Sequence, residues 1–283
     1  MDATKLYDQL EKDFITSALT DEWANQVTSI ADFVTPQYQK RFMGLVCDHT
    51  KIINKVYTAV FPSNSVMQAI LDKNETNILL FVHHPATWDV RRAPQVFTPM
   101  NRDLLQKFKD HQISIYNLHV PLDSFGKYST TVSLAKKLNL KIEKKFAPYF
   151  GALCGIIGET EFDDVSELVK LFELAVGHRV SLYQNGLSEI KSHKVAVVAG
   201  GGNDLEILKE IFSEGINTFI TGIAVKNNHS LTAHDYAQEN KINILGGTHY
   251  STEKFACQSL CQYFQQLGLP SEFVVDLPVL EDL

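Results

Sequence analysis

The sequence predicts an α/β protein made of two similar halves with mixed, largely parallel sheets. Short apolar runs typical of buried strands alternate with helical stretches along the chain. Two segments, beginning at Val56 and Val195, repeat the same layout of strand, turn, helix and strand. Hydrophobic residues make up 45% and charged residues 21% of the 283 positions, which excludes disordered and low-complexity classes.

The first of these segments is the clearest part of the N-terminal half. A helix is expected at 3–18, whereas 20–50 carries no clear periodicity. VYTAVF (56–61) is a predicted strand, 62–65 a turn with a helix cap, 66–73 a helix and NILLFV (77–82) a fully apolar strand. An unbroken apolar run of this length is typical of a buried parallel sheet.

The second segment has the same order of elements. VAVVAG (195–200) is a predicted strand, 201–204 a capped turn, 205–212 a helix and 216–221 a strand. When Val56 is laid on Val195 without gaps, these elements stay in register, which suggests two related halves. A common strand–helix–strand motif that arose twice would give the same pattern.

The remaining elements fill in around the two segments. Helices are predicted at 102–110, 129–139, 164–177, 231–240 and 251–268, and strands at 113–120, 149–159, 241–247 and 273–278. No Pro/Ser-rich linker separates the halves, and the C-terminal elements are expected to return to the first. We therefore expect a first domain of 1–128 plus 241–283 and a second of 129–240.

Charge and cysteine content narrow the class of protein further. The net charge of −7 argues against nucleic-acid binding driven by overall charge. The longest apolar run, 78–82, is far shorter than the roughly 20 residues that span a bilayer. Four cysteines are too few for a disulfide scaffold and are expected to be reduced. A soluble cytoplasmic protein without membrane contact is the expectation.

Histidines follow two of the predicted strands. His83 and His84 come directly after 77–82, and His119 comes at the end of 113–120, four residues before Asp123. Active sites of α/β sheets lie at the carboxyl ends of strands, where adjacent side chains can converge. The alternatives are that His83 and His84 are partly exposed loop residues and that Asp123 is a helix cap.

A third histidine lies between a predicted strand and a long helix. If the helix begins near Tyr250, His249 and Glu253 share one helical face at i, i+4 spacing and can offer two ligands to one metal site. The alternative is a capping box, in which Ser251 or Thr252 caps the helix and Glu253 favours its positive end.

Together these stretches offer up to four imidazoles and two carboxylates. That is too many ligands for one tetrahedral zinc ion and suits two divalent ions that share a carboxylate and a water. Imidazole and carboxylate ligands suit zinc, iron, manganese, cobalt or nickel, and spacing does not choose among them.

Three other features admit two interpretations each. Arg91 and Arg92 could hold a substrate phosphate or form a solvated charge pair. The glycine turn at 200–202 could bind phosphate at a helix start, or Asn203 or Asp204 could cap that helix. His229 and His234 are expected at the surface, although either could approach the site from the second half.

Three motifs carry a resemblance to a known family. FVHHPATW (81–88), NLHVPLDS (117–124) and GGTHYSTE (246–253) resemble the signatures of the Nif-three-like (NGG-interacting factor three) family, whose members are also labelled GTP cyclohydrolase 1 type 2 homologues. Two departures exist. The family's early W-D-N-x-G-L pattern is only echoed at 23–26, and Ile223 stands where many members carry Glu.

The resemblance implies a dinuclear metal centre between two similar α/β halves and assembly into a toroidal homohexamer. Its ligands would be His83, His84, Asp123, His249 and Glu253, with His119 adjacent to them.

Two functions are consistent with such a centre. The first is a metal-dependent hydrolase that acts on a small phosphorylated or nucleotide-like substrate, and the cyclohydrolase label comes from the resemblance alone. The alternative is a non-enzymatic metal-handling protein or a protein-interaction and regulatory scaffold. A third interpretation is an α/β protein whose histidines bind nothing.

Overall fold

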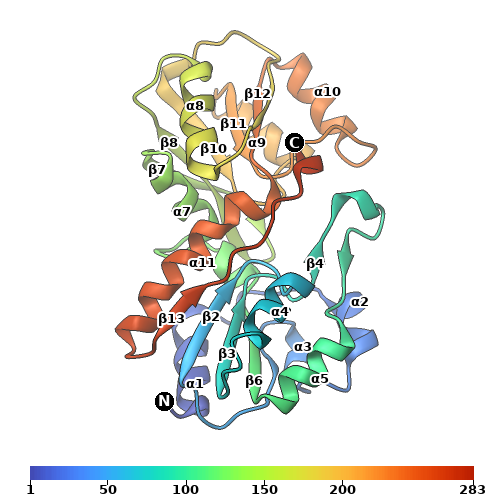
Figure 1. Ribbon diagram of the computed structural model, residues 1–283. Coiled ribbons are helices and arrows are strands. Elements are labelled where there is room, and N and C mark those ends of the chain that lie inside the picture. Colours follow the sequence, from blue (N-terminus) through green and yellow to red (C-terminus); the bar gives the residue numbers. More distant parts are fainter. The chain divides into compact units, whose positions relative to one another are not determined.

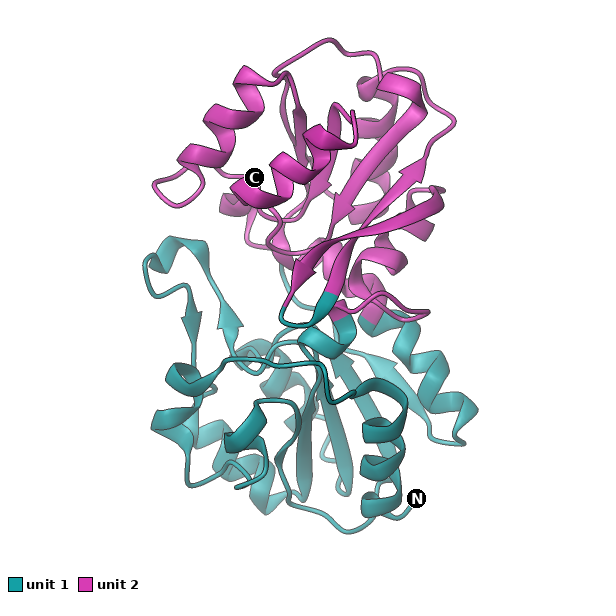
Figure 2. Cartoon of the chain, turned by 180° about the vertical axis from the view of Figure 1, so that it is seen from behind, with its two compact units in different colours: residues 1–122, 150–152, 257–277 teal, residues 123–149, 153–256, 278–283 magenta.

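The computed structural model describes residues 1–283 and confirms the α/β class with mixed, largely parallel sheets (Figure 1). The chain divides into two compact units, drawn in teal and magenta in Figure 2. Unit 1 comprises Met1–Leu122, Phe150–Ala152 and Cys257–Leu277, and unit 2 comprises Asp123–Tyr149, Leu153–Ala256 and Pro278–Leu283.

This division differs from the domain boundaries predicted from the sequence. The prediction placed all of 241–283 in the first domain, whereas 241–256 belong to unit 2. The reason is strand pairing, because β12 (Asn243–Gly246) lies parallel to β11 (Thr218–Thr221) in the sheet of unit 2. The helix α11 (His249–Gln266) begins in unit 2 and ends in unit 1.

Unit 1 is built on a five-stranded sheet in the order β1-β6-β3-β2-β13. All neighbours are parallel except β1 and β6. Its elements are α1 (Ala3–Phe14), α2 (Ala24–Val27), α3 (Tyr38–Arg41), β1 (Gly44–Cys47), β2 (Lys55–Ala59), α4 (Asn64–Leu71), β3 (Ile78–Val82), β4 (Thr87–Trp88), β5 (Phe97–Thr98), α5 (Arg102–Asp110), β6 (Ile113–Asn117) and β13 (Ser271–Phe273). The short helix α6 (Val120–Asp123) ends at the first residue of unit 2.

Helices cover both faces of this sheet. Alternate strand residues such as Leu80 and Ile115 pack with α4 and α5 in one apolar cluster. On the other face Tyr116 stacks on Tyr7 of α1, and Phe81 contacts Phe264 of α11. Because both faces are buried, the strands read as continuous apolar runs in the sequence.

Unit 2 is built on a six-stranded sheet in the order β7-β8-β10-β11-β12-β9. The central strands β10, β11 and β12 are parallel, β8 is antiparallel to β10, and β9 is antiparallel to β12. Its elements besides β11 and β12 are α7 (Thr130–Lys137), β7 (Lys141–Tyr149), β8 (Ala152–Glu159), α8 (Val165–Val176), β9 (Ser181–Tyr183), β10 (Lys194–Val198), α9 (Leu205–Ser213) and α10 (Leu231–Glu239).

Two apolar clusters cover the two faces of the unit 2 sheet. On one face α7 and α8 pack on strand residues that include Val197 and Ile220. On the other face α9 and α10 pack on residues that include Val198 and Phe219. The structure pairs none of the four cysteines in a disulfide; Cys47 and Cys257 are buried, whereas Cys154 and Cys261 are half-buried.

The repeated layout predicted from the sequence is confirmed. β2-α4-β3 and β10-α9-β11 are both parallel units, and their helices are capped by Ser63 and Asp204. The strand predicted at 149–159 is wrong at its start, because the chain turns at Phe150 and Gly151, both with positive φ, and β7 and β8 lie side by side. None of the helices has the length and apolar character needed to cross a membrane.

Candidate functional site

In unit 1 the candidate histidines lie at the carboxyl edge of the sheet. The last residues of β3 and β6, Val82 and Asn117, are register partners, so the two strands end side by side. His83 and His84 follow directly after β3, and His119 follows two residues after β6. Parallel pairing therefore brings imidazoles together from segments about 35 residues apart.

The exit of β6 fixes the orientation of His83. Its Nδ1 lies 3.0 Å from the carbonyl oxygen of Leu118, so Nδ1 carries the proton and Nε2 holds the lone pair. The Asn117 amide donates to the carbonyl of His83 and accepts a 2.8 Å hydrogen bond from the Tyr38 hydroxyl. A backbone carbonyl on one imidazole nitrogen is the usual arrangement of a metal-binding histidine.

The three imidazoles of unit 1 form a buried cluster. One ring nitrogen from each of His83, His84 and His119 lies within 4.8 Å of the others, and all three residues are buried. The Trp23 ring meets His84 and His119 edge-on, and Phe61 stacks on His84. The alternative that His83 and His84 are exposed loop residues is therefore wrong, and the cluster could hold a metal ion.

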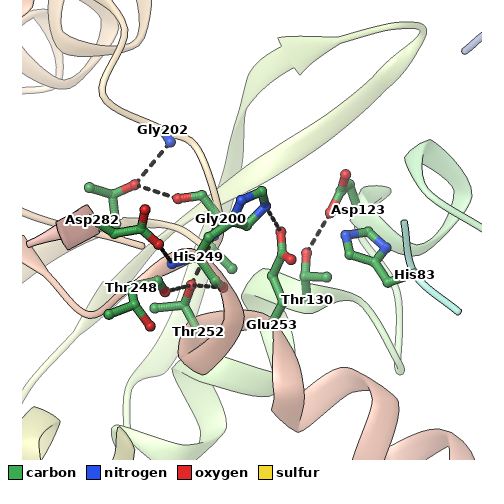
Figure 3. Close-up of polar contacts among 12 residues, drawn as sticks. His83, Asp123, Thr130, Gly200, Gly202, Thr248, His249, Thr252, Glu253 and Asp282 are labelled. Atoms are coloured by element: carbon green, nitrogen blue, oxygen red, sulfur yellow. Dashed lines mark hydrogen bonds and ion pairs between the residues drawn. The ribbon is translucent and has the colours of Figure 1, made fainter. Parts of the chain in front are cut away.

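In unit 2 an imidazole and a carboxylate meet at the start of α11. His249 is the first residue of this helix, one turn before Glu253, and its Nε2 lies 3.2 Å from Glu253 Oε1 (Figure 3). Both side chains are buried. The i, i+4 geometry expected from the sequence is confirmed, and an imidazole and a carboxylate are groups that could hold a metal ion.

The start of α11 is held by residues other than those expected to cap it. Thr248 accepts the Ser251 N–H at 3.2 Å, and the Asp282 carboxylate accepts the His249 N–H at 2.9 Å. Thr252 Oγ1 accepts the Gly200 N–H at 3.0 Å, which ties the helix to the glycine turn after β10 (Figure 3). Ser251 and Thr252 lie inside the helix, so the capping-box alternative is wrong.

The glycine turn approaches the carboxylate of Glu253 closely. Gly200 has φ +72°, and a Cβ at this position would overlap Glu253 Oε1 and lie 3.3 Å from His249 Cδ2. Only a residue without a side chain allows this backbone to lie against the pair. The helix after the turn is capped by Asp204, as one alternative predicted, through its bond from Glu206 N–H.

Asp123 ends the helix α6 at the first residue of unit 2. Its Oδ1 accepts a 2.8 Å hydrogen bond from the buried hydroxyl of Thr130, and Ser129 is the N-cap of α7. Asp123 is therefore not a helix cap. Burial, and secondarily the charge of Asp123, raises the pKa of Cys154 to about 12. A thiol with that pKa stays protonated at neutral pH.

The remaining candidate residues differ in exposure and in their hydrogen-bond partners. Arg91 is exposed and donates two hydrogen bonds to the Asp89 carboxylate, at 2.7 and 3.0 Å, so a carboxylate already balances its charge. Arg92 is exposed as well. His229 is exposed, as expected. The surface position expected for His234 is wrong, because α10 buries this imidazole against the core.

Several residues that contact the candidate ligands were not found from the sequence, and three of them carry a polar side chain that hydrogen-bonds to one of these ligands. They are Asp21 beside His119, Thr130 beside Asp123, and Asp282 beside His249. Asp21 and Asp282 reach their partners across 98 and 33 residues of sequence. A single sequence carries no local signal for such contacts. Asp21 lies two residues before Trp23, where the sequence echoes the family's early motif, and this is the only hint of its role.

The chemistry of these residues fits a divalent transition-metal ion. Buried imidazole nitrogens and carboxylate oxygens are the ligands that such ions prefer. Buried His, Asp and Glu residues of this chain could therefore hold a metal ion. Identity and number of ions do not follow from the donor set.

Comparison with known proteins agrees with the family resemblance found in the sequence. A family model described as Duf34/NIF3 (NGG1p interacting factor 3) matches residues 22–281. A protein of Buchnera aphidicola subsp. Acyrthosiphon pisum, named GTP cyclohydrolase 1 type 2 homolog, is 28% identical over 226 residues, which cover 79% of this chain and 84% of the relative. A Pyrococcus horikoshii protein of the same name is 28% identical over 229 residues, 78% of this chain and 84% of its own.

Solved structures share the fold at lower identity. Protein ybgI, described as of unknown function, superimposes with a TM-score of 0.76 at 20% identity and covers 98% of this chain and 100% of its own. The protein TTHA1606 from Thermus thermophilus gives 0.68 at 20% identity, with 99% and 100% covered. The match of the family model over most of the sequence shows that this chain belongs to the Duf34/NIF3 family.

Proposed function

We propose that the protein binds two divalent metal ions and uses them to hydrolyse a small phosphorylated or nucleotide-like substrate. The proposed ligands are His83, His84, Asp123, His249 and Glu253. The observation that carries the proposal is the burial of metal-type ligands at the strand exits of both units, the imidazole cluster of unit 1 and the His249–Glu253 pair of unit 2.

Burial is the physical argument for a cation. Removing a carboxylate such as Glu253 from water costs several kcal/mol unless a charge or several hydrogen bonds compensate it. Three imidazole nitrogens that lie within 4.8 Å of one another are close enough to bind one ion together. Neutral imidazole and ionised carboxylate are the protonation states that bind metal ions.

The choice of hydrolysis follows from the chemistry of such ions. Two bound divalent ions supply Lewis acids that activate water for attack on an ester, phosphoester or amide. The residues of the chain would hold and orient the substrate. Arg92 is an exposed cation eight residues after His84 and is the better candidate for a substrate phosphate, because Arg91 is paired with Asp89.

The substrate class rests partly on the relatives. Proteins named GTP cyclohydrolase 1 type 2 homolog share 28% identity with this chain, which favours a nucleotide-like compound. We also propose that the chain forms a homo-oligomer, as the family resemblance implies. Size-exclusion chromatography with light scattering tests this assembly directly.

The first test is metal analysis of purified protein by mass spectrometry. Wild type is expected to hold about two ions per chain. His83→Ala in unit 1 and His249→Ala in unit 2 should each lower that number, whereas the exposed His229→Ala is the matched control and should not. A wild-type protein without metal after loading with zinc, manganese, iron, cobalt or nickel would refute the proposal.

The second test separates catalysis from metal handling. Metal-loaded wild type and His83→Ala are assayed on a panel of phosphate esters, nucleotides and cyclic amides. Turnover that needs both the metal and His83 supports a hydrolase. If the panel shows no turnover while the ions bind tightly and exchange reversibly, the non-enzymatic alternative of a metal-handling or scaffold protein is correct.

A further inference from the structure

A carboxylate lies behind one imidazole of the unit 1 cluster. Asp21 belongs to the segment between α1 and α2, and its side chain is only 2% exposed. Its two carboxylate oxygens lie 3.0 and 3.2 Å from His119 Nδ1, and the second oxygen also accepts the Val120 N–H at 3.4 Å. The Asp21 side chain therefore connects the segment before α2 to the residues that follow β6.

The contact fixes which nitrogen of His119 holds the lone pair. A carboxylate only accepts hydrogen bonds, so Nδ1 of His119 must carry the proton. In the neutral ring the lone pair then lies on Nε2. The edge-on packing of Trp23, with ring centroids 5.0 Å apart, restricts rotation of the same imidazole.

The three imidazoles of the cluster differ in what holds them. His83 donates its Nδ1 proton to a neutral backbone carbonyl, that of Leu118, whereas His119 donates to an ionisable carboxylate. A carboxylate partner makes the opposite nitrogen more basic and a stronger ligand than a carbonyl does. Asp21 can therefore tune His119 electronically as well as orient it.

We propose that Asp21 is a positioning residue of the metal centre, which holds His119 in the tautomer that presents Nε2 to an ion bound by His83 and His84. The inference rests on the proposed metal centre and adds His119 to its ligands through a carboxylate–histidine–metal arrangement. Asp21 itself touches no ion. It acts through His119.

Zinc affinity measures this role. The variants are Asp21→Ala, which removes the acceptor, and Asp21→Asn, which keeps an acceptor oxygen without the charge. Competition with a chromophoric chelator should show about 10- to 100-fold weaker zinc binding for Asp21→Ala, with Asp21→Asn between it and wild type. Asp32→Asn, an exposed carboxylate of the same unit paired with Arg102, is the matched control and should bind as wild type does.

A double-mutant cycle separates positioning from general damage to the fold. If Asp21 acts through His119, Asp21→Ala should cause no further loss of zinc affinity in a His119→Ala background. An equal loss in both backgrounds would overturn the inference. Wild-type zinc affinity in Asp21→Ala would overturn it as well, while leaving the proposed metal centre standing.

A metal-free measurement keeps the two proposals distinguishable. The ¹⁵N shifts of the His119 ring at a pH where it is neutral should show a protonated Nδ1 in wild type and a mixture of tautomers in Asp21→Ala. Equal shifts in both proteins would overturn the role of Asp21. If wild type binds no zinc, the proposed function fails, and these shifts still decide whether Asp21 holds His119.

Discussion

The two units share a strand order but place different chemistry at the carboxyl edge of their sheets. Unit 1 runs β2-α4-β3-α5-β6 and unit 2 runs β10-α9-β11-α10-β12, each with its three strands adjacent and parallel. Directly after the second of these strands, unit 1 has His83 and His84 (after β3), whereas unit 2 has Gly222 and Ile223 (after β11). The topology repeats, whereas the residues at the edge do not.

The segments that follow the third strands, β6 and β12, are the exception, because they are similar in both units. His119 and His249 follow β6 and β12 within three residues, and each has a carboxylate four positions later, Asp123 and Glu253. In both cases a helical turn, α6 or the start of α11, lies between imidazole and carboxylate. The edge of the unit 1 sheet thus carries adjacent imidazoles, whereas in unit 2 a glycine backbone makes room for one imidazole–carboxylate pair.

The largest loss of stability is expected when a side chain is added at Gly200, where the backbone lies against Glu253. Gly200→Ala forces a positive φ on a residue with a Cβ and overlaps Glu253 Oε1, so the free energy of unfolding should fall by about 2–4 kcal/mol. Because Glu253 must move, bound zinc should fall as well. Chemical denaturation and metal analysis measure the two effects.

The neighbouring glycine is the control for this change. A Cβ at Gly201 would meet Ile223 Cδ1 at 3.5 Å, an ordinary contact, so Gly201→Ala should stay within about 1 kcal/mol of wild type. Equal behaviour of the two variants would mean that the close approach of Gly200 does not constrain Glu253.

A smaller effect is expected at the start of α11. Asp282 is buried and accepts the His249 N–H at 2.9 Å, so Asp282→Ala leaves a buried donor without its charged acceptor. The expected loss in the free energy of unfolding is about 1–3 kcal/mol, measured by urea denaturation. Glu281→Ala, next to it on the surface, is the control. A loss no larger than that of the control would show that water replaces the carboxylate.

The parts of the fold found from the sequence are those with a local pattern. The apolar run 77–82 and the capped turns before α4 and α9 predict parallel strand–helix–strand units, and α11 shows its helical spacing directly. The edge strand β7 was missed because KIEKKFAPY reads as polar and charged, and β4, β5 and β9 are only two or three residues long. Such short strands depend on their neighbours rather than on their own sequence.

The candidate site divides in the same way. The histidines at strand exits were found because a strand end is visible in the sequence, and His249 and Glu253 because their spacing is helical. The contacts of Asp21, Thr130 and Asp282 were missed, because the fold alone brings these residues to their partners. That His83, His84, Asp123, His249 and Glu253 hold two ions stays a prediction.

The smallest effect concerns an imidazole outside the ligand clusters. His234 in unit 2 is buried with its Nε2 2.9 Å from the Ala224 carbonyl, and desolvation lowers its pKa below the usual 6.5. The unfolded chain therefore takes up a proton at higher pH than the folded protein does, and this site contributes stability above about pH 6.5 that is lost as the pH falls. His234→Gln removes the titration, so its unfolding free energy should decline less between pH 7.5 and 5.5 than that of wild type.

His229→Gln, exposed in the preceding loop, should leave the pH dependence unchanged. Urea denaturation at several pH values measures all three proteins, and equal slopes for His234→Gln and wild type would mean that the His234 ring becomes protonated without leaving its buried position.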